Sequence, residues 1–316
     1  MRPGTILAAP ASGPGGRGLR LLPLVQPHPA RTIGGAVKYG FVFPRGDARL
    51  AADFAREAEQ AGWDGFFVWE PIWGVDAWMS LAAAAMQTSR IRLGTMVTPP
   101  SRRRPWKLAG ETATLDQLSK GRAILSVGLG AIDTGFAEFG EVTDRKTRAE
   151  LLDESLDIIT GLWRGQPFAY AGKHFTIQPK DFYPPPPPVQ QPRIPIWVVA
   201  AWGSARSMAR ALRFDGILPT KIDPAGKHVP VTPEDVRRIA EYAATKRAPG
   251  SPALDIIVEG VIEGNDLSAV AERVRPMAEA GATWWIEAMW SAIDDMATPE
   301  GQAAVLARLR LGPPLV

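Results

Sequence analysis

Eight short apolar runs, each followed by an amphipathic stretch, are the strongest constraint on the fold of this chain of 316 residues. They begin near residues 38, 65, 91, 122, 194, 216, 255 and 283, and most successive starts lie about one βα unit apart. Runs without polar alternation are typical of parallel strands covered on both faces. Eight such units predict an α/β protein with a closed (β/α)8 TIM barrel. An open doubly wound sheet is the alternative, but GLGAID at 128–133 lacks the third glycine of the dinucleotide fingerprint.

The stretches between the runs have helical periodicity. Residues 49–61 and 147–163 carry apolar positions along one face, and Thr147 with Glu150 forms a potential capping box. Asp47, Thr232 and Thr298 are further N-cap candidates, the last two followed by proline.

The chain divides into two parts. Residues 1–36 hold 6 Pro and 7 Gly, so we expect a low-complexity, disordered tail, or a start of translation near Val37. Residues 37–316 form the predicted single barrel domain. The fourth and fifth runs lie unusually far apart, and the gap holds a long helix and FAYAGKHFTI, a potential short hairpin around Gly172. We expect this helix and hairpin to be an insertion between the fourth and fifth strands.

Composition excludes several classes of function. Lys and Arg number 36 against 33 Asp and Glu, and these charges are interspersed, which argues against a nucleic-acid partner or a membrane surface. No run approaches the ~18 apolar residues of a membrane span, so we expect a cytoplasmic protein. The sequence contains no cysteine, and His28, His174 and His228 lack metal-ligand spacing, so we expect no metal site.

In a barrel of this type the chemistry belongs at the carboxyl ends of the strands. The predicted ends are rich in aromatic residues and methionine and poor in titratable groups. After the fifth run, Ala201-Trp202-Gly203-Ser204 leads into a helix without a real loop. The backbone N–H groups of such a helix start bind phosphate readily, and an ordinary capped helix with solvated arginines is an equal alternative.

Charged side chains near strand ends allow other chemistry. Glu70, Glu259 and Glu287 have the chemistry of acid/base catalysts, although we favour pairing with the basic run at 102–104. Lys221, after the sixth run, is either a Schiff-base lysine or, as we favour, an exposed loop lysine.

Six segments, taken in order, resemble the bacterial-luciferase-like family of flavin-dependent oxidoreductases, which are (β/α)8 barrels. The matching segments are EAEQAGWDGFFVWE, SRIRLGTMVTPPSRRRPWKLAGETATLDQLSKGRAILSVGLG, RAELLDESLDIITGLWRG, YAGKHFTI, IPIWVVAAWGSARSMARALRFDG and AEAGATWWIE. The resemblance extends from about Val37 to Leu309.

The resemblance implies a cofactor in the barrel mouth, either reduced FMN or a deazaflavin coenzyme of the F-420 type. The implied cofactor-binding residues are Gly94, Thr95, Met96, Ser126, Gly128, Ala201, Trp202, Gly203, Ser204, Arg206 and Ser207. The implied substrate pocket is formed by Phe41, Trp69, Thr98, Glu259, Glu287 and Trp290.

The chain departs from the family at three places. Many relatives read Trp-Asp-His at the end of the second strand, where this chain reads Trp69-Glu70-Pro71, so Glu70 is the candidate catalytic residue for proton transfer or ring orientation. Leu129 stands where the relatives nearest to luciferase have an arginine for the FMN phosphate. Ala200-Ala201 replaces the usual Gly-Gly.

The implied reaction is oxygenation of a small organic substrate by reduced FMN and O2, with a separate flavin reductase as partner. A deazaflavin-dependent reductase or dehydrogenase that transfers hydride is the alternative. A cofactor-free lyase or hydrolase using Lys221 or the glutamates, and a non-catalytic flavin-binding protein, are alternatives of other classes. Because relatives often dimerise, a homodimer is also expected.

Overall fold

The computed structural model describes residues 37–179, 185–223, 227–260 and 266–314, and all structural statements refer to these ranges. The expected tail, residues 1–36, lies outside them. Within them, no helix combines the length and apolarity that crossing a membrane requires.

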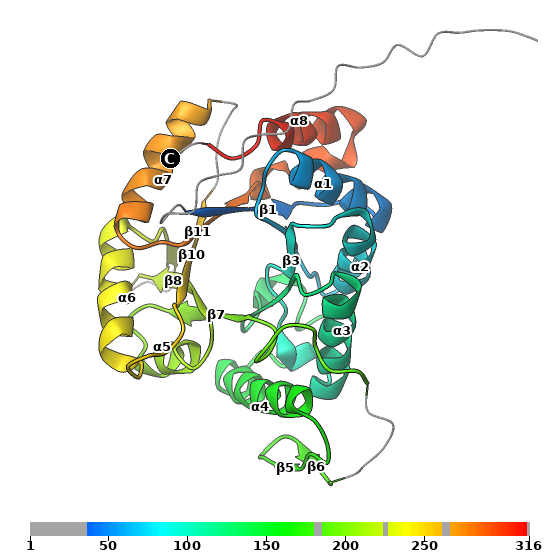
Figure 1. Cartoon of the computed structure of the whole chain (residues 1–316), viewed down its shortest axis with the longest axis vertical. Coiled ribbons are helices and arrows are strands. Elements are labelled where there is room, and N and C mark those ends of the chain that lie inside the picture. Colours follow the sequence, from blue (N-terminus) through cyan, green and yellow to red (C-terminus); the bar gives the residue numbers. More distant parts are fainter. Residues whose placement is uncertain (1–36, 180–184, 224–226, 261–265, 315–316) are drawn as a thin grey trace, which may run out of the picture. The chain divides into compact units, whose positions relative to one another are not determined.

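Eight parallel strands form a closed barrel, as predicted (Figure 1). The strands are β1 (Lys38–Phe43), β2 (Gly65–Val68), β3 (Arg92–Thr95), β4 (Ala123–Val127), β7 (Ile196–Ala201), β8 (Gly216–Ile222), β10 (Asp255–Gly260) and β11 (Trp284–Ala288). Each pairs with the next along the chain, β11 pairs with β1, and pairing of β10 with β8 joins the two halves of the sheet. Every strand begins within two residues of a predicted apolar run.

Each strand is followed by a helix, with α1 to α3 on one side of the barrel and α5 to α7 on the opposite side (Figure 1). The helices are α1 (Ala48–Gln60), α2 (Ala77–Gln87), α3 (Pro105–Leu118), α4 (Arg145–Arg164), α5 (Ala205–Ala211), α6 (Pro233–Lys246), α7 (Leu267–Glu279) and α8 (Pro299–Arg310). Short 3-10 turns at Pro100–Arg102, Ile132–Thr134, Trp290–Ala292 and Asp295–Ala297 lie in the connections.

The helix starts follow the predicted capping with one exception. Asp47, Thr232 and Thr298 accept hydrogen bonds from the first turns of α1, α6 and α8. The capping box predicted at Thr147 and Glu150 is wrong. Asp144 caps α4 instead and accepts the Thr147 N–H at 2.7 Å. Asp144 thus satisfies an N–H group of the first turn, and Glu150 instead binds Lys173 and His174 of the following hairpin.

The segment between β4 and β7 contains α4, which is the helix of the fourth βα unit, and then a small antiparallel hairpin of β5 (Tyr170–Ala171) and β6 (Thr176–Ile177). Glu154 of α4 accepts backbone N–H groups of Lys173, His174 and Phe175 in the hairpin turn. A Cβ at Gly172 would lie 2.3 Å from Glu154 Oε2, so only glycine allows this approach.

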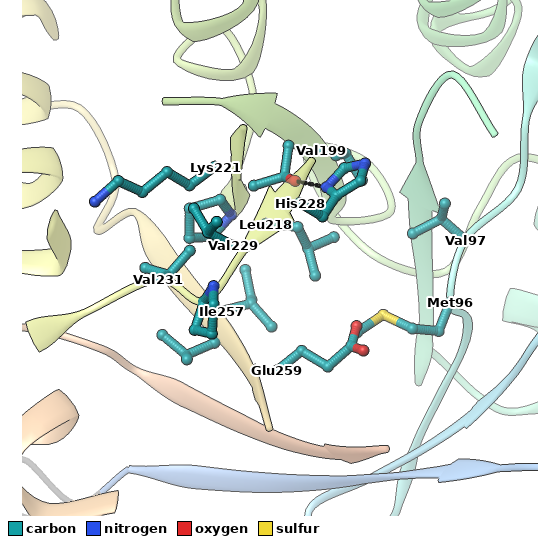
Figure 2. A pocket seen from close by; sticks show the side chains of 14 residues that line it. Met96, Val97, Val199, Leu218, Lys221, His228, Val229, Val231, Ile257 and Glu259 are labelled. Atoms are coloured by element: carbon teal, nitrogen blue, oxygen red, sulfur yellow. Dashed lines mark hydrogen bonds between the residues drawn. The ribbon is translucent and has the colours of Figure 1, made fainter. Parts of the chain in front are cut away.

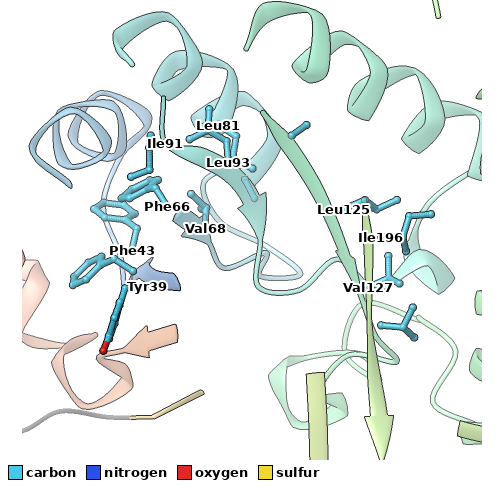
Figure 3. Packing of buried hydrophobic residues seen from close by; sticks show 14 of the residues in the cluster. Tyr39, Phe43, Phe66, Val68, Leu81, Ile91, Leu93, Leu125, Val127 and Ile196 are labelled. Atoms are coloured by element: carbon cyan, nitrogen blue, oxygen red, sulfur yellow. The ribbon is translucent and has the colours of Figure 1, made fainter. Parts of the chain in front are cut away.

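Two apolar layers lie on the two sides of the barrel wall. On β1, Phe41 and Phe43 face the surrounding helices, whereas Val42 faces the barrel interior. The outer layer includes Phe66, Leu93 and Leu125 (Figure 3).

Aromatic rings fill the interior of the barrel. Phe67 stacks on Trp197 with ring centroids 5.4 Å apart, and Trp197 meets Trp284 edge-on at 5.0 Å. All three rings are buried, so the barrel is a packed core with chemistry confined to its open ends.

Candidate functional site

A cavity of ≈ 350 Å³ opens at the carboxyl ends of β3, β7, β8 and β10, which we call the barrel mouth (Figure 2). Its lining residues are Met96, Val97, Val199, Leu218, Pro219, Thr220, Lys221, His228, Val229, Pro230, Val231, Ile257, Val258 and Glu259. Most of them are apolar, and Lys221, His228 and Glu259 are the titratable side chains of this lining. Of the predicted site residues, Met96 and Glu259 line the cavity directly.

One wall of the cavity comes from an extension of β8 that the sequence analysis missed. Beyond its barrel pairings, β8 continues to Ile222 and pairs antiparallel with the two-residue strand β9 (His228–Val229). His228 Nδ1 lies 3.0 Å from Thr220 Oγ1, which ties the two strands together (Figure 2). A two-residue strand is too short to show a sequence period, so His228 was placed in a loop.

Lys221 lies on the cavity wall, but its ammonium group is already bound. Its Nζ lies 2.9 and 2.8 Å from the two carboxylate oxygens of Asp235, and Asp235 also accepts hydrogen bonds from Thr232 at the start of α6. An ammonium held in this way is not poised as an uncharged nucleophile, which weakens the Schiff-base alternative.

Glu259 is the carboxylate of the cavity lining. It follows Ile257 on the inner face of β10, and Trp290 Nε1 donates a hydrogen bond to its Oε1. Trp290 in turn meets Trp69 edge-on, with ring centroids 6.4 Å apart. Although solvent reaches this side chain, the surrounding protein desolvates the carboxyl and raises its pKa, which the hydrogen bond from Trp290 opposes.

The ends of β3 and β4 lie behind the cavity. Met96 packs in the interior cluster, and the Met96–Val97 peptide bond is cis. A Cβ at Gly128 would lie 2.9 Å from Val199 and 3.2 Å from Val97, so this glycine leaves room for two lining side chains.

Gly94 and Ser126 lie deeper than predicted. A Cβ at Gly94 would lie 3.1 Å from the Phe67 ring, so an interior phenylalanine packs closely against this glycine. Ser126 is fully buried in the barrel and does not line the cavity.

The structure places Glu70 in a buried network of hydrogen bonds and ion pairs. Glu70 lies an odd number of positions after Phe67, whose ring packs in the barrel interior. The Glu70 carboxylate accepts hydrogen bonds from Thr98 Oγ1 at 2.6 Å and Arg103 Nε at 2.9 Å. Arg102 Nη2 lies 3.5 Å from the same carboxylate. This pairing confirms the salt-bridge interpretation for Glu70, because both of its carboxylate oxygens accept hydrogen bonds from neighbouring side chains.

Four other predicted site residues face outward, because strand side chains alternate between the two faces. Thr95 and Thr98 belong to the buried cluster around Glu70, with their hydroxyl oxygens 2.9 Å apart. Phe41 packs edge-on against Trp63 with ring centroids 5.3 Å apart. Glu287, opposite Phe41 on β11, pairs with Arg308 of α8 rather than with the run at 102–104. None of these four residues is among those that line the cavity at the barrel mouth.

The start of α5 has the predicted helix-end geometry. Ser204 caps the helix and accepts the Ser207 N–H, Gly203 has a φ of 91°, and Ser207 Oγ accepts the Ala201 N–H at 3.0 Å. Trp202 turns outward onto Tyr242 of α6. Arg206 is exposed and forms no ion pair with any residue in the described part of the chain.

Sequence comparisons identify relatives of this chain. A family model described as luciferase-like monooxygenase matches residues 27–308. An uncharacterized protein of Mycobacterium tuberculosis is 32% identical over 235 residues, which cover 74% of this chain and 77% of that protein. An F420-dependent glucose-6-phosphate dehydrogenase of Kineococcus radiotolerans is 33% identical over 160 residues, covering 47% of this chain and 46% of that protein.

Solved structures share the barrel. The coenzyme F420-dependent tetrahydromethanopterin reductase of Methanopyrus kandleri has a TM-score of 0.68 and 17% identity, covering 87% of this chain and 96% of its own. The FMN-bound oxygenating constituent of 3,6-diketocamphane monooxygenase of Pseudomonas putida has a TM-score of 0.63 and 19% identity, covering 89% and 99%. At these identities the likeness concerns the fold alone.

Proposed function

The chain belongs to the luciferase-like monooxygenase family, whose members are oxidoreductases, and from this premise we propose that it is a deazaflavin-dependent oxidoreductase that transfers hydride to or from a small organic substrate. The observation that carries the proposal is the apolar cavity at the barrel mouth, with few titratable side chains in its lining. A site so poor in acids and bases suits chemistry that a bound cofactor supplies.

The cavity suits a flat ring system. Its volume of ≈ 350 Å³ lies within the usual range for small-molecule sites, and its walls are mainly Val, Leu, Ile and Met side chains. Met96, Val97 and Val199 would lie against the ring, and the absence of a side chain at Gly128 leaves room for the two valines. The residues that line the cavity therefore fit the ring system of a deazaflavin.

The start of α5 provides groups that can bind the anionic tail of the cofactor. This helix starts next to the end of β7, whose Val199 lines the cavity. The first-turn N–H groups and the exposed Arg206 together favour a phosphate there.

When bound, a deazaflavin supplies the hydride acceptor or donor. The protein side chains orient the substrate against the ring, exclude water with the apolar walls and leave Glu259 for proton exchange. The similarity to the F420-dependent glucose-6-phosphate dehydrogenase of Kineococcus radiotolerans supports this cofactor over FMN.

Oxygenation by reduced FMN and O2 is the second candidate. It is supported by the description of the family model and by the FMN-bound oxygenase of the same fold. The family resemblance of the sequence favours this reaction, whereas the F420-dependent activity of the Kineococcus radiotolerans relative favours hydride transfer.

Titration of the purified chain with oxidised deazaflavin and with oxidised and reduced FMN, followed by absorbance and fluorescence, tests the proposal. We expect deazaflavin binding with a Kd below about 100 μM, roughly −5.5 kcal/mol. We expect Arg206→Ala to weaken it about 5- to 10-fold, because an exposed arginine that binds phosphate contributes roughly 1 kcal/mol. Arg237→Ala on α6, which removes an exposed arginine paired with Glu234, is the matched control and leaves the Kd unchanged.

Each outcome has a distinct meaning. Preferential binding of reduced FMN selects the second candidate. Binding of neither cofactor below about 100 μM removes both, and borohydride trapping at Lys221 then becomes the next experiment.

A further inference from the structure

Glu259 differs from the other two glutamates that the sequence places at strand ends. Glu70 and Glu287 face outward and are paired with arginines, whereas Glu259 lies on the inner face of β10 and lines the cavity. It is the one carboxylate among the described cavity-lining residues. Any acid/base chemistry by a carboxylate in this cavity therefore belongs to it.

The hydrogen bonding of Glu259 leaves one oxygen for a ligand. Trp290 Nε1 donates to Oε1, and within the described ranges Oε2 accepts no hydrogen bond. The edge-on contact of Trp290 with Trp69 limits the movement of the indole that holds the carboxyl. A carboxyl fixed through one oxygen presents the other in a defined direction, as a proton-transfer group requires.

No cation neutralises Glu259 within the described residues. The two other titratable side chains of the cavity lining, on β8 and β9, have partners elsewhere: Lys221 binds Asp235 and His228 lies within hydrogen-bond distance of Thr220. On the neighbouring strand β11, Glu287 faces α8. Desolvation thus acts on Glu259 without a compensating charge, and its raised pKa brings both protonation states closer to neutral pH.

Resting on the proposed function, we propose that Glu259 is the catalytic residue that exchanges a proton with the hydroxyl or carbonyl oxygen of the substrate. In the direction of alcohol oxidation, the carbinol C–H bond breaks and its electron pair passes as hydride to the oxidised deazaflavin. The O–H bond breaks and its proton passes to the Glu259 carboxylate, while the C=O bond forms. The reverse reaction returns both.

The same carboxylate predicts a substrate preference. A desolvated carboxylate without a cationic partner repels phosphate and carboxylate groups. We therefore expect neutral alcohols such as 2-propanol and cyclohexanol to be oxidised in preference to a sugar phosphate such as glucose 6-phosphate.

A test that does not require turnover uses the Trp290 indole. In ¹⁵N-labelled full-length protein, the indole N–H resonance, assigned with Trp290→Phe, is followed from pH 4 to pH 9. We expect a titration midpoint above 4.5 for the wild type and its loss in Glu259→Gln. A resonance that titrates identically in Glu259→Gln, or does not titrate in the wild type, overturns the proposed environment of Glu259.

The catalytic test compares wild type, Glu259→Gln, Glu259→Asp and the exposed-surface control Glu272→Gln with oxidised deazaflavin and the two alcohols. We expect kcat in Glu259→Gln to fall at least about 100-fold with the acidic limb of the pH profile lost. Glu259→Asp restores part of the rate, and Glu272→Gln behaves as wild type. The Kd of the deazaflavin stays within about 3-fold in all variants.

Two results contradict this inference, and a third contradicts its premise. Wild-type kcat and pH profile in Glu259→Gln, or a wild type that binds deazaflavin but oxidises neither alcohol, overturns the role of Glu259. A wild type that does not bind deazaflavin overturns the proposed function itself, which the cofactor titration reports separately.

Discussion

At the scale of single residues, three glutamates near strand ends have three different surroundings. Glu70 lies in a cluster with Thr98, Arg102 and Arg103, Glu287 is buried against Arg308, and Glu259 is held by an indole N–H. The distinction depends on which face of the strand each side chain occupies and on which partners meet it there. Identical side chains therefore pair with arginines in two cases, whereas the third lines the cavity and is the one for which we propose a chemical role.

Glu70→Gln tests the structural role of the first glutamate. Because it removes the negative charge facing two largely buried arginines, we expect the free energy of unfolding in urea to fall by about 3 kcal/mol. Cofactor affinity and kcat of the folded fraction should stay within about 3-fold of wild type. A stable variant with a large loss of kcat would instead restore Glu70 as a catalytic candidate.

Glu287 predicts a pH dependence of stability. Burial raises its pKa from the ordinary 4.5 to about 7, against the opposing effect of Arg308. Between these values the folded protein binds more protons at this site than the unfolded chain, so stability falls as the pH rises from about 4.5 to 7 and then levels off. The contribution is up to about 3 kcal/mol.

Urea unfolding of wild type and Glu287→Gln across this pH range measures the effect. The difference between the two free energies of unfolding should change through the range, because the glutamine variant lacks the titrating carboxyl. A difference that stays constant from pH 4.5 to 8 would show that Glu287 does not titrate as its burial indicates.

At the scale of elements, close packing between strands explains particular glycines. Gly216 opens β8 beside the barrel interior, where an added Cβ would lie 2.3 Å from Trp197 Cδ1 and 2.8 Å from Ile257 Cδ1. The ring of Trp197 is part of the aromatic core, so it has little room to move. By contrast, a Cβ at Gly110 of α3 meets no atom within 4 Å.

These two glycines form a matched pair for mutagenesis. We expect Gly216→Ala to destabilise the protein by about 1–3 kcal/mol through overpacking. Gly110→Ala should stabilise it by about 0.5–1 kcal/mol, because alanine loses less backbone entropy in a helix. Denaturation midpoints in urea give both values, and equal effects of the two changes would contradict this account of β8.

At the scale of the whole barrel, the packed interior forms the core of the fold and the open mouth provides the cavity. Phe67, Trp197 and Trp284 fill the lower barrel, so a ligand can enter only as far as the layer of Met96, Val199 and Ile257. The extension of β8 with β9 then builds a wall above that layer. The cavity therefore depends on β3, β7, β8 and β10, which come from distant parts of the chain and meet when the barrel closes.

The sequence by itself determined the number, order and approximate starts of the eight barrel strands and the presence of helices between them. Apolar runs and caps such as Asp47 and Thr232 are local signals, because burial of a segment depends on its own side chains and a cap bonds the turn that follows it directly. The helix start with Ser204 and the family resemblance were accessible for the same reason.

Only the tertiary structure decided which residues at the strand ends face the mouth. Side chains alternate with a period of two, and fully apolar strands carry no mark of their inner face, so Phe41 and Glu287 were assigned to the wrong side. Glu70 meets partners about thirty positions away, a pairing that depends on how neighbouring units pack. The wall built by His228 and Val229 depends on a strand too short to leave a pattern, and its antiparallel pairing with the end of β8 places it beside the cavity.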